Sequence, residues 1–311
     1  MTMTPLPADF LLPFQFRDLG IRGRLVRLGT VADTVLRTHA YPDAVGKLLA
    51  EALVLSAALA GALKFDGIFT LQTKGDGPVS MLVADTTSAG EMRGYAKFDA
   101  ERLQRAAGGA AAPVPKLLGT GYLAFTVDQG PHTERYQGIV ELHGATLADC
   151  AHRYLRQSEQ IEAGIRLAAH HVPDVEGMSR WGAAALTLQR LPESDGMRTS
   201  DEDQESSVEN WRRVLALMSS VTDSELLDTT LGPYDLLHRL FHEERVNVSD
   251  AKPLLHRCRC SELRVQRALA SIPEEELENL KVNGRIEVTC EFCNACYVFD
   301  ESVLRRFRAV G

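Results

Sequence analysis

The chain has 311 residues, which at roughly 100–200 residues per domain predicts about two domains. Hydrophobic residues make up 45% of the sequence and charged residues 24%, a composition that excludes wholesale disorder. Asp and Glu number 42 against 34 Lys and Arg, so the formal charge is −8. This balance argues against a nucleic-acid partner, because phosphate binding needs a cationic surface.

The sequence also argues against membrane insertion and export. The longest apolar run, residues 52–63, has 12 residues, whereas a membrane-spanning helix needs about 20. The first ten residues, MTMTPLPADF, lack the basic region and apolar core of a signal peptide. We therefore expect a cytoplasmic protein without a membrane partner.

Residues 1–193 are predicted to form an α+β domain, an antiparallel sheet packed with helices. Apolar runs of strand length separated by turn sequences such as GDGP indicate a meander and then a hairpin, and Ala- and Leu-rich segments indicate helices. The predicted strands are 68–74, 79–85, 92–98, 121–128, 135–142, 165–172 and 183–191, and the predicted helices are 45–63 and 147–160.

The composition changes after this domain. Residues 200–209 contain five acids and predict a linker, and the amphipathic patterns of 208–218 and 234–242 predict a helical connector within residues 194–250. Residues 251–311 hold five of the six cysteines and are predicted to form a small zinc-binding α+β module.

The cysteines of this module are spaced as two close pairs. Cys258 and Cys260 are separated by one residue, Cys290 and Cys293 by two, and 29 residues lie between the pairs. Two such pairs brought together by folding can supply four sulfurs to one tetrahedral zinc ion, with Zn–S distances of about 2.3 Å. The sequence therefore predicts a zinc site with these four ligands.

The second pair has the sequence context of a zinc knuckle. Asn283-Gly284 predicts a turn, and residues 286–289 and 297–300 predict the two strands of a hairpin around the CEFC motif.

The first pair can share an ion only if the backbone bends, since strand residues two apart lie nearly 7 Å apart. Ser261 is expected to provide the bend by capping the helix that follows it, and Ser271 and Glu274 are expected to form a capping box around Pro273 for a second helix.

Several functions are compatible with four such cysteines. One is a permanent structural zinc site, including a nucleic-acid-binding zinc ribbon; the near balance of ten basic and nine acidic residues in 251–311 disfavours the ribbon. An iron–sulfur cluster is another, because Cys290, Cys293 and Cys296 follow a C-x2-C-x2-C pattern. A thioredoxin-like enzyme is weaker, because CEFC does not begin a predicted helix.

A zinc-held redox switch is the remaining possibility. A module of about 60 residues is marginally stable, and structural zinc can supply on the order of 10–16 kcal/mol of apparent folding free energy. Oxidation of the thiolates to disulfides would remove the ligands and with them the ion, so that the module unfolds.

The sequence resembles the bacterial redox-regulated chaperonins of the heat-shock protein 33 family. The resemblance rests on the motifs CRCSEL, CEFCNACYVF, LKFDGIFTLQTKGDGPVSMLVAD, MRGYAKF, GYLAFTVD, ERYQGIVEL, QSEQI, LQRLP and LFHEERV, and runs from about residue 10 to residue 299. It implies an ATP-independent holdase that is inactive while reduced and zinc-bound. The resemblance assigns one zinc ion per chain to Cys258, Cys260, Cys290 and Cys293.

The same resemblance implies the activated state. Oxidation would form the disulfides Cys258–Cys260 and Cys290–Cys293, release zinc and loosen the connector. The exposed apolar surface would bind unfolding client proteins under oxidative and heat stress. The family's active form is a homodimer that passes clients to ATP-dependent refolding chaperones.

Cys296 departs from the family pattern, which does not usually have a cysteine three residues after the last ligand. This extra thiol could pair with Cys293, leave Cys290 without a partner, or replace a ligand.

Other conspicuous side chains are expected to have structural rather than chemical roles: Cys150, His256, His170, His171, Trp181, Trp211, and the solvated pair Glu243 and Glu244. No spacing indicates a nucleophile with its base, paired carboxylates or a phosphate-binding loop, so we predict a protein that is not an enzyme.

Overall fold

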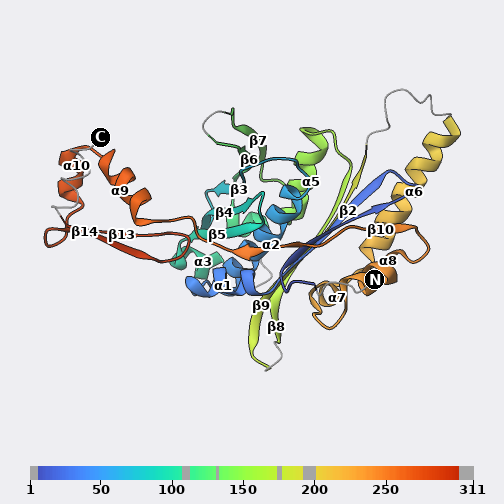
Figure 1. Ribbon diagram of the computed structural model, residues 1–311, viewed down its shortest axis with the longest axis horizontal. Coiled ribbons are helices and arrows are strands. Elements are labelled where there is room, and N and C mark those ends of the chain that lie inside the picture. The colour runs from blue at the N-terminus through green and yellow to red at the C-terminus, as the bar shows by residue number, and fades with distance from the viewer. Residues whose placement is uncertain (1–5, 107–112, 131–132, 174–176, 192–200, 301–311) are drawn as a thin grey trace. The chain divides into compact units, whose positions relative to one another are not determined.

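The computed structural model describes residues 6–106, 113–130, 133–173, 177–191 and 201–300 (Figure 1). The chain forms two compact units, residues 1–256 and residues 257–311. Both helices and sheets are present, so the predicted α+β class is confirmed. The predicted boundary at residues 193–194 lies outside the described residues.

The first sheet of the larger unit is antiparallel. Its strands, in spatial order, are β10 (Val246–Val248), β1 (Phe10–Phe16), β2 (Ile21–Leu28), β9 (Ser179–Arg190) and β8 (Ala163–Pro173), with β11 (Lys252–Pro253) also paired to β1. The predicted strands 165–172 and 183–191 are thus confirmed as one hairpin. Both faces of this sheet are buried, and alternate residues along each strand belong to different cores.

The second sheet contains the predicted meander and hairpin. Its strands, in spatial order, are β12 (Leu255–His256), β5 (Glu91–Phe98), β4 (Val79–Thr87), β3 (Ile68–Gly75), β6 (Gly121–Asp128) and β7 (Tyr136–Glu141). All neighbours are antiparallel except β12 and β5, which are parallel.

Helix α2 (Asp43–Ala60) lies between the two sheets (Figure 1). Alanine and leucine favour a helix and let both sheets approach it closely, which is why most of α2 is buried. The same core is covered by the remaining helices of this part, α1 (Thr30–Thr38), α3 (Ala100–Ala106), α4 (Val114–Leu118) and α5 (Leu147–Gln157). None of the helices in the described residues combines the length and the hydropathy needed to cross a bilayer.

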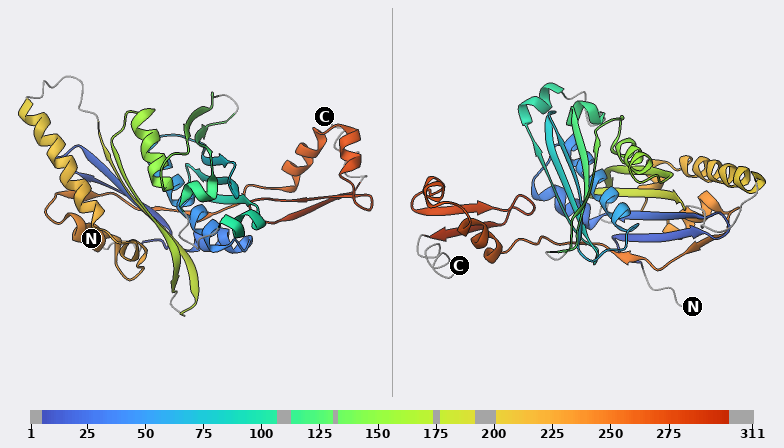
Figure 2. Two further views of the ribbon diagram at one scale, coloured as in Figure 1. Left: turned by 180° about the vertical axis from the view of Figure 1, so that it is seen from behind. Right: turned by 90° about the horizontal axis from the view of Figure 1, so that it is seen from above.

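Three helices cover the other face of the first sheet: α6 (Asp201–Ser219), α7 (Asp223–Leu227) and α8 (Pro233–Phe241). Figure 2 shows them on the side of the sheet opposite α2. The paired residues Leu12, Leu25 and Leu186 point toward these helices, and their chain neighbours Leu11, Val26 and Ala185 point toward α2. The first sheet is therefore apolar on both faces, and α6–α8 bury one of them.

The acidic segment differs from the prediction. Residues 201–209 are helical and form the first half of α6, whereas the sequence predicted a linker over 200–209. Acidic side chains near a helix N-terminus interact favourably with the helix dipole, so the acidic run is compatible with a helix start. Glu244 also differs: its side chain is only 10% exposed and accepts a hydrogen bond from Arg213 Nε at 2.8 Å.

The smaller unit contains α9 (Glu262–Ala270), α10 (Glu274–Asn279) and the antiparallel hairpin of β13 (Arg285–Thr289) and β14 (Cys296–Asp300). The Asn283-Gly284 turn is confirmed, with φ of 53° and 75° at its two residues, as a tight hairpin turn requires. The buried core of the described part consists of only four residues, Leu269, Leu277, Ile286 and Phe299.

The predicted capping box of the second helix is wrong. Pro273 is the N-cap residue of α10 and provides no side-chain hydrogen bond. Ser271 instead ends α9, and its hydroxyl donates to the Ala268 carbonyl at 2.7 Å. A serine at this position can either end one helix or cap the start of the next, and in this structure Ser271 ends α9.

Candidate metal centre

Four cysteine thiols meet in the smaller unit. The Sγ atoms of Cys258, Cys260, Cys290 and Cys293 all lie within 4.8 Å of one another, and each residue is half-buried. Cys258 Sγ is 3.7 Å from Cys290 Sγ, and Cys260 Sγ is 3.4 Å from Cys293 Sγ. The structure thus brings together the two pairs that the sequence singled out.

The first pair is positioned by the start of α9. Ser261 is extended, with φ −156° and ψ 156°, and its side chain accepts a hydrogen bond from the Arg264 backbone N–H, so the expected N-cap is confirmed. Arg264 also donates through Nη1 to the Arg259 carbonyl at 2.5 Å. These bonds fix the segment between the two cysteines against the first turn of the helix.

The second pair is positioned by the turn between β13 and β14. The Cys290 N–H donates to the Ala295 carbonyl, and the Asn294 N–H donates to the Cys290 carbonyl, both at 2.9 Å. Asn294 adopts a positive φ of 55°, which asparagine tolerates better than most residues. This compact turn is the predicted knuckle and aims both thiols to one side.

The spacing of the sulfurs fits a tetrahedral metal site. Zn–S bonds of about 2.3 Å place the sulfurs of a tetrahedron about 3.8 Å apart. The two Sγ–Sγ distances, 3.7 and 3.4 Å, are close to that value. Four sulfur donors suit zinc or an iron–sulfur centre and disfavour hard cations such as Mg²⁺ and Ca²⁺.

The proton equilibria of the thiols also indicate a cation site. Burial disfavours the Cys258 thiolate, but hydrogen bonds from the Cys260 N–H and neighbouring thiols outweigh it and lower the pKa to about 7. Burial, together with the neighbouring thiols, raises the pKa of Cys293 to about 12. One thiol therefore ionises readily and its charge opposes ionisation of the others, so four thiolates together require a compensating cation.

The comparisons with known proteins give the family. The sequence profile of the Hsp33 protein family matches residues 9–300. This chain belongs to the Hsp33 family. A 33 kDa chaperonin of Caulobacter vibrioides is 40% identical over 294 residues, covering 94% of this chain and 95% of the relative. Another, from Ectopseudomonas mendocina, is 40% identical over 306 residues, covering 97% and 96%.

A solved structure shares the fold of this Hsp33 family member. The crystal structure of the 33 kDa chaperonin from Thermotoga maritima superposes with a TM-score of 0.74 at 23% sequence identity. The match covers 97% of this chain and 98% of the other.

Tyr297 is a residue of the site that the sequence did not reveal. Its hydroxyl donates a hydrogen bond to Cys260 Sγ at 3.1 Å, and this contact raises the pKa of the phenol to about 12. The sequence predicted only that Tyr297 lies on the second strand of the hairpin. Its role beside a thiol could not be predicted, because no recognised motif places a tyrosine four residues after a cysteine. Hydrogen bonds to a sulfur tune its reactivity, so Tyr297 is placed to influence the Cys260 thiol.

The extra thiol lies outside the four-sulfur group. Cys296 begins β14, opposite Thr289, and is exposed. In this geometry the position of the fourth sulfur is taken by Cys293, which leaves Cys296 accessible to solvent.

The remaining candidates have structural surroundings. Cys150 is fully buried in α5 and burial raises its pKa, and Trp181 and Trp211 are each 7% exposed. His256 lies in β12, outside the four-sulfur group, and burial lowers its pKa. His171 packs on the Trp181 ring with a centroid distance of 4.2 Å. These positions agree with the structural roles expected from the sequence.

Proposed function

We propose that this Hsp33 family member is a redox-regulated, ATP-independent molecular chaperone, a holdase that is inactive when reduced. The convergence of Cys258, Cys260, Cys290 and Cys293 carries the proposal. The family membership and the chaperonin names of its relatives support it.

The proposed ligands of one zinc ion per chain are these four cysteines. Bound zinc would keep the thiolates deprotonated and close together and would add folding free energy to a unit with very little core of its own. The described core of four residues supports this dependence on the ion.

The proposed disulfides are Cys258–Cys260 and Cys290–Cys293. Each forms when two cysteines give two electrons to an oxidant; with hydrogen peroxide, two thiols and one peroxide yield one disulfide and two waters. A unit whose four thiolates have become two disulfides has no ligands left for the ion. The short Cys260–Cys293 contact of 3.4 Å makes a crossed pairing the alternative to be tested by disulfide mapping.

The surface that binds clients is proposed to lie in the larger unit. In the proposed organisation residues 1–193 are the chaperone core, 194–250 the connector and 251–311 the switch. Helices α6–α8 bury an apolar sheet face, and their release would expose it. The residues that these helices cover include Phe10, Leu12, Phe14, Phe16, Ile21, Leu25, Leu186 and Leu188.

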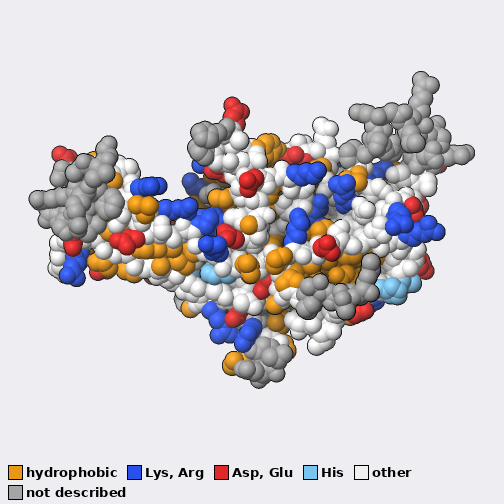
Figure 3. Space-filling model, viewed as in Figure 1, with side chains coloured by type: hydrophobic (Ala, Val, Ile, Leu, Met, Phe, Trp, Pro, Cys, Tyr) orange, Lys and Arg blue, Asp and Glu red, His pale blue; other side chains and the backbone are white. Residues whose placement is uncertain are grey.

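The partners follow from the holdase activity. We propose unfolded proteins as clients, a homodimer in the oxidised state, ATP-dependent refolding chaperones downstream, a cytoplasmic location and no catalytic reaction. Nucleic acid is not a proposed partner, because Asp and Glu number 42 against 34 Lys and Arg. On the face seen in Figure 3 the two kinds of charge lie interspersed.

Light scattering of a thermally unfolding client tests the proposal. The reduced, metal-loaded protein should not suppress aggregation, and the same protein after peroxide treatment with mild warming should. Cys290→Ser should abolish the switch, whereas Cys296→Ser, which removes a thiol outside the site, should retain it. Equal suppression by reduced and oxidised protein would contradict the proposal.

The second candidate is a permanent metal module for binding or electron transfer, which the four-sulfur geometry also allows. Elemental analysis and a visible spectrum separate the two. One zinc in a colourless protein excludes an iron–sulfur centre, and zinc that persists through full oxidation excludes the switch.

A further inference from the structure

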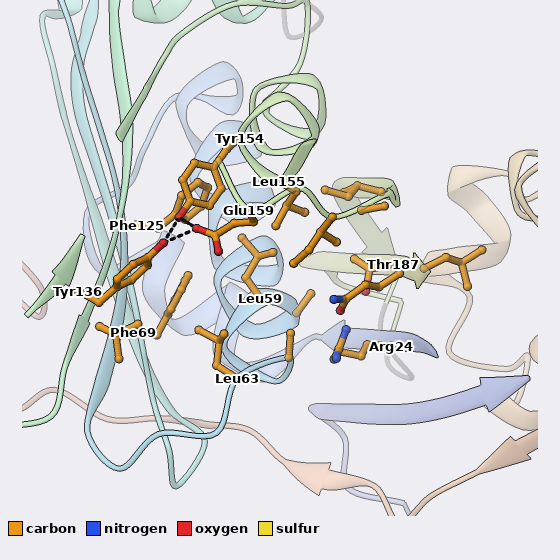
Figure 4. Close-up of a pocket in the computed structure, with 18 residues that line it drawn as sticks. Arg24, Leu59, Leu63, Phe69, Phe125, Tyr136, Tyr154, Leu155, Glu159 and Thr187 are labelled. Atoms are coloured by element: carbon orange, nitrogen blue, oxygen red, sulfur yellow. Dashed lines mark hydrogen bonds between the residues drawn. The ribbon is translucent and has the colours of Figure 1, made fainter. Parts of the chain in front are cut away.

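A cavity of about 120 Å³ lies in the larger unit between α2, α5 and the two sheets (Figure 4). Its walls are mostly apolar and include Leu59, Leu63, Phe69, Phe125 and Leu155. Leu63 is 47% exposed, so the cavity is reachable from solvent. Its size is comparable to that of an apolar cavity that accommodates a benzene ring, about 150 Å³.

One end of the cavity contains a buried cation, Arg24, for which none of the described residues is a partner. Arg24 lies on β2 and is only 8% exposed, yet it has no hydrogen bond or ion pair with any described residue. Arg27, three residues later on the same strand, is a buried arginine with acceptors. Its guanidinium donates to the carbonyls of Glu225, Leu226 and Leu231. The guanidinium of Arg24 lines the cavity, and its nitrogens are not among the fully enclosed polar atoms, so a ligand in the cavity can reach them. A guanidinium stays charged and has only donors, so Arg24 favours an anion there.

A second polar group without a partner lies beside it. Thr187 is directly opposite Arg24 in the pairing of β2 and β9. Its Oγ1 is fully buried and has no hydrogen-bond partner among the described residues. Figure 4 shows both side chains at the same end of the cavity. Together they offer one cationic fork and one hydroxyl, enough for a single carboxylate.

The other end is closed by groups that already satisfy one another. Glu159 Oε1 accepts a hydrogen bond from Tyr154 Oη at 2.5 Å and another from Tyr136 Oη. Figure 4 shows this network across the cavity from Arg24, with Leu59 and Leu63 between. The polar end of a ligand is therefore needed only at Arg24.

We propose that this cavity binds a small amphiphilic monocarboxylate, with its carboxylate on Arg24 and Thr187 and its aryl or alkyl body among Leu59, Phe69 and Phe125. A planar carboxylate can accept two hydrogen bonds from the guanidinium group. The apolar part of the cavity can enclose an aryl or alkyl group. A phosphate is a poorer fit, because two or more negative charges would face a single cation.

The test uses the reduced full-length protein and 4-phenylbutyrate as the probe, followed by ligand-observed NMR titration. The neutral 4-phenylbutanol carries the same body without the charge. Saturable binding of the carboxylate, at least tenfold tighter than binding of the alcohol, is expected. If the unmutated protein shows no saturable binding, or equal affinity for the two probes, the proposal is overturned.

Two variants locate the carboxylate. Arg24→Met keeps the length of the side chain and should weaken 4-phenylbutyrate at least tenfold, while it leaves 4-phenylbutanol within twofold. Arg212→Met changes an exposed arginine that does not line the cavity and should alter neither. Unchanged carboxylate affinity in a folded Arg24→Met protein would overturn the assignment.

Discussion

Replacement of Phe241 by alanine should raise the fraction of the reduced protein in which α8 is detached from the first sheet. Phe241 is 1% exposed, and its ring meets the Phe16 ring edge to face at a centroid distance of 5.1 Å and the Phe14 ring at 6.1 Å. A buried Phe→Ala change costs about 3–5 kcal/mol. At 1.4 kcal/mol per tenfold change, a loss of about 4 kcal/mol raises the open population of this helix about a thousandfold.

Hydrogen exchange measured by mass spectrometry reports this opening directly. Amides of α8 in the reduced Phe241→Ala protein should exchange by about two to three orders of magnitude faster than in the parent, since exchange follows the open population. Phe241→Leu, which keeps most of the apolar volume, is the matched control and should show a much smaller effect.

The same variant links packing to activity. If release of α6–α8 exposes the client surface, reduced Phe241→Ala protein should suppress client aggregation without oxidant. Faster exchange in α8 without any gain of activity would refute the assignment of the sheet face. Unchanged exchange would refute the packing estimate itself.

Three further substitutions test other parts of the structure. Arg27→Met removes three hydrogen bonds to carbonyls near α7 and should cost about 2–4 kcal/mol in denaturant unfolding; an unchanged free energy of unfolding would contradict a stabilising role of these bonds. Tyr297→Phe removes the donor to Cys260 Sγ and should make peroxide oxidise the metal-loaded thiols several-fold faster in a thiol-loss assay; an unchanged rate would refute a tuning role. Burial raises the pKa of Glu51 from 4.5 to about 7, so the protonated form favours folding and its contribution is lost as pH rises from about 4.5 to 7. Glu51→Gln should therefore stabilise the protein by about 2 kcal/mol at pH 8 and much less at pH 5, and an equal effect at both pH values would contradict the shift.

Local patterns predicted much of the fold because their determinants are local. The meander of β3–β5 follows from strand-length apolar runs with turn residues between them. The β13–β14 hairpin follows from two strand-length runs on either side of the CEFC motif, and the Asn283-Gly284 turn leads into its first strand. The meeting of Cys258, Cys260, Cys290 and Cys293 could be predicted because two close pairs of cysteines are a spacing typical of a metal site.

The misses involve interactions that only tertiary structure decides. The acidic segment 201–209 is helical, and Ser271 ends one helix instead of starting another. Tyr297 meets Cys260, which precedes α9, and Arg24 meets Thr187 on β9; both partners are distant in the sequence. No spacing in the sequence reports that Arg24 and Thr187 line one cavity, because that property depends on how the sheets and helices pack in space.

The central claim is that sulfur chemistry determines whether the ion stays and whether clients are bound. One oxidation time course can test it, with metal release, loss of free thiols and client binding recorded on the same sample. The account predicts that the ion leaves as the four thiols of Cys258, Cys260, Cys290 and Cys293 disappear, and that client binding rises with or after that loss. Client binding that rises while the ion and the thiols remain would contradict it.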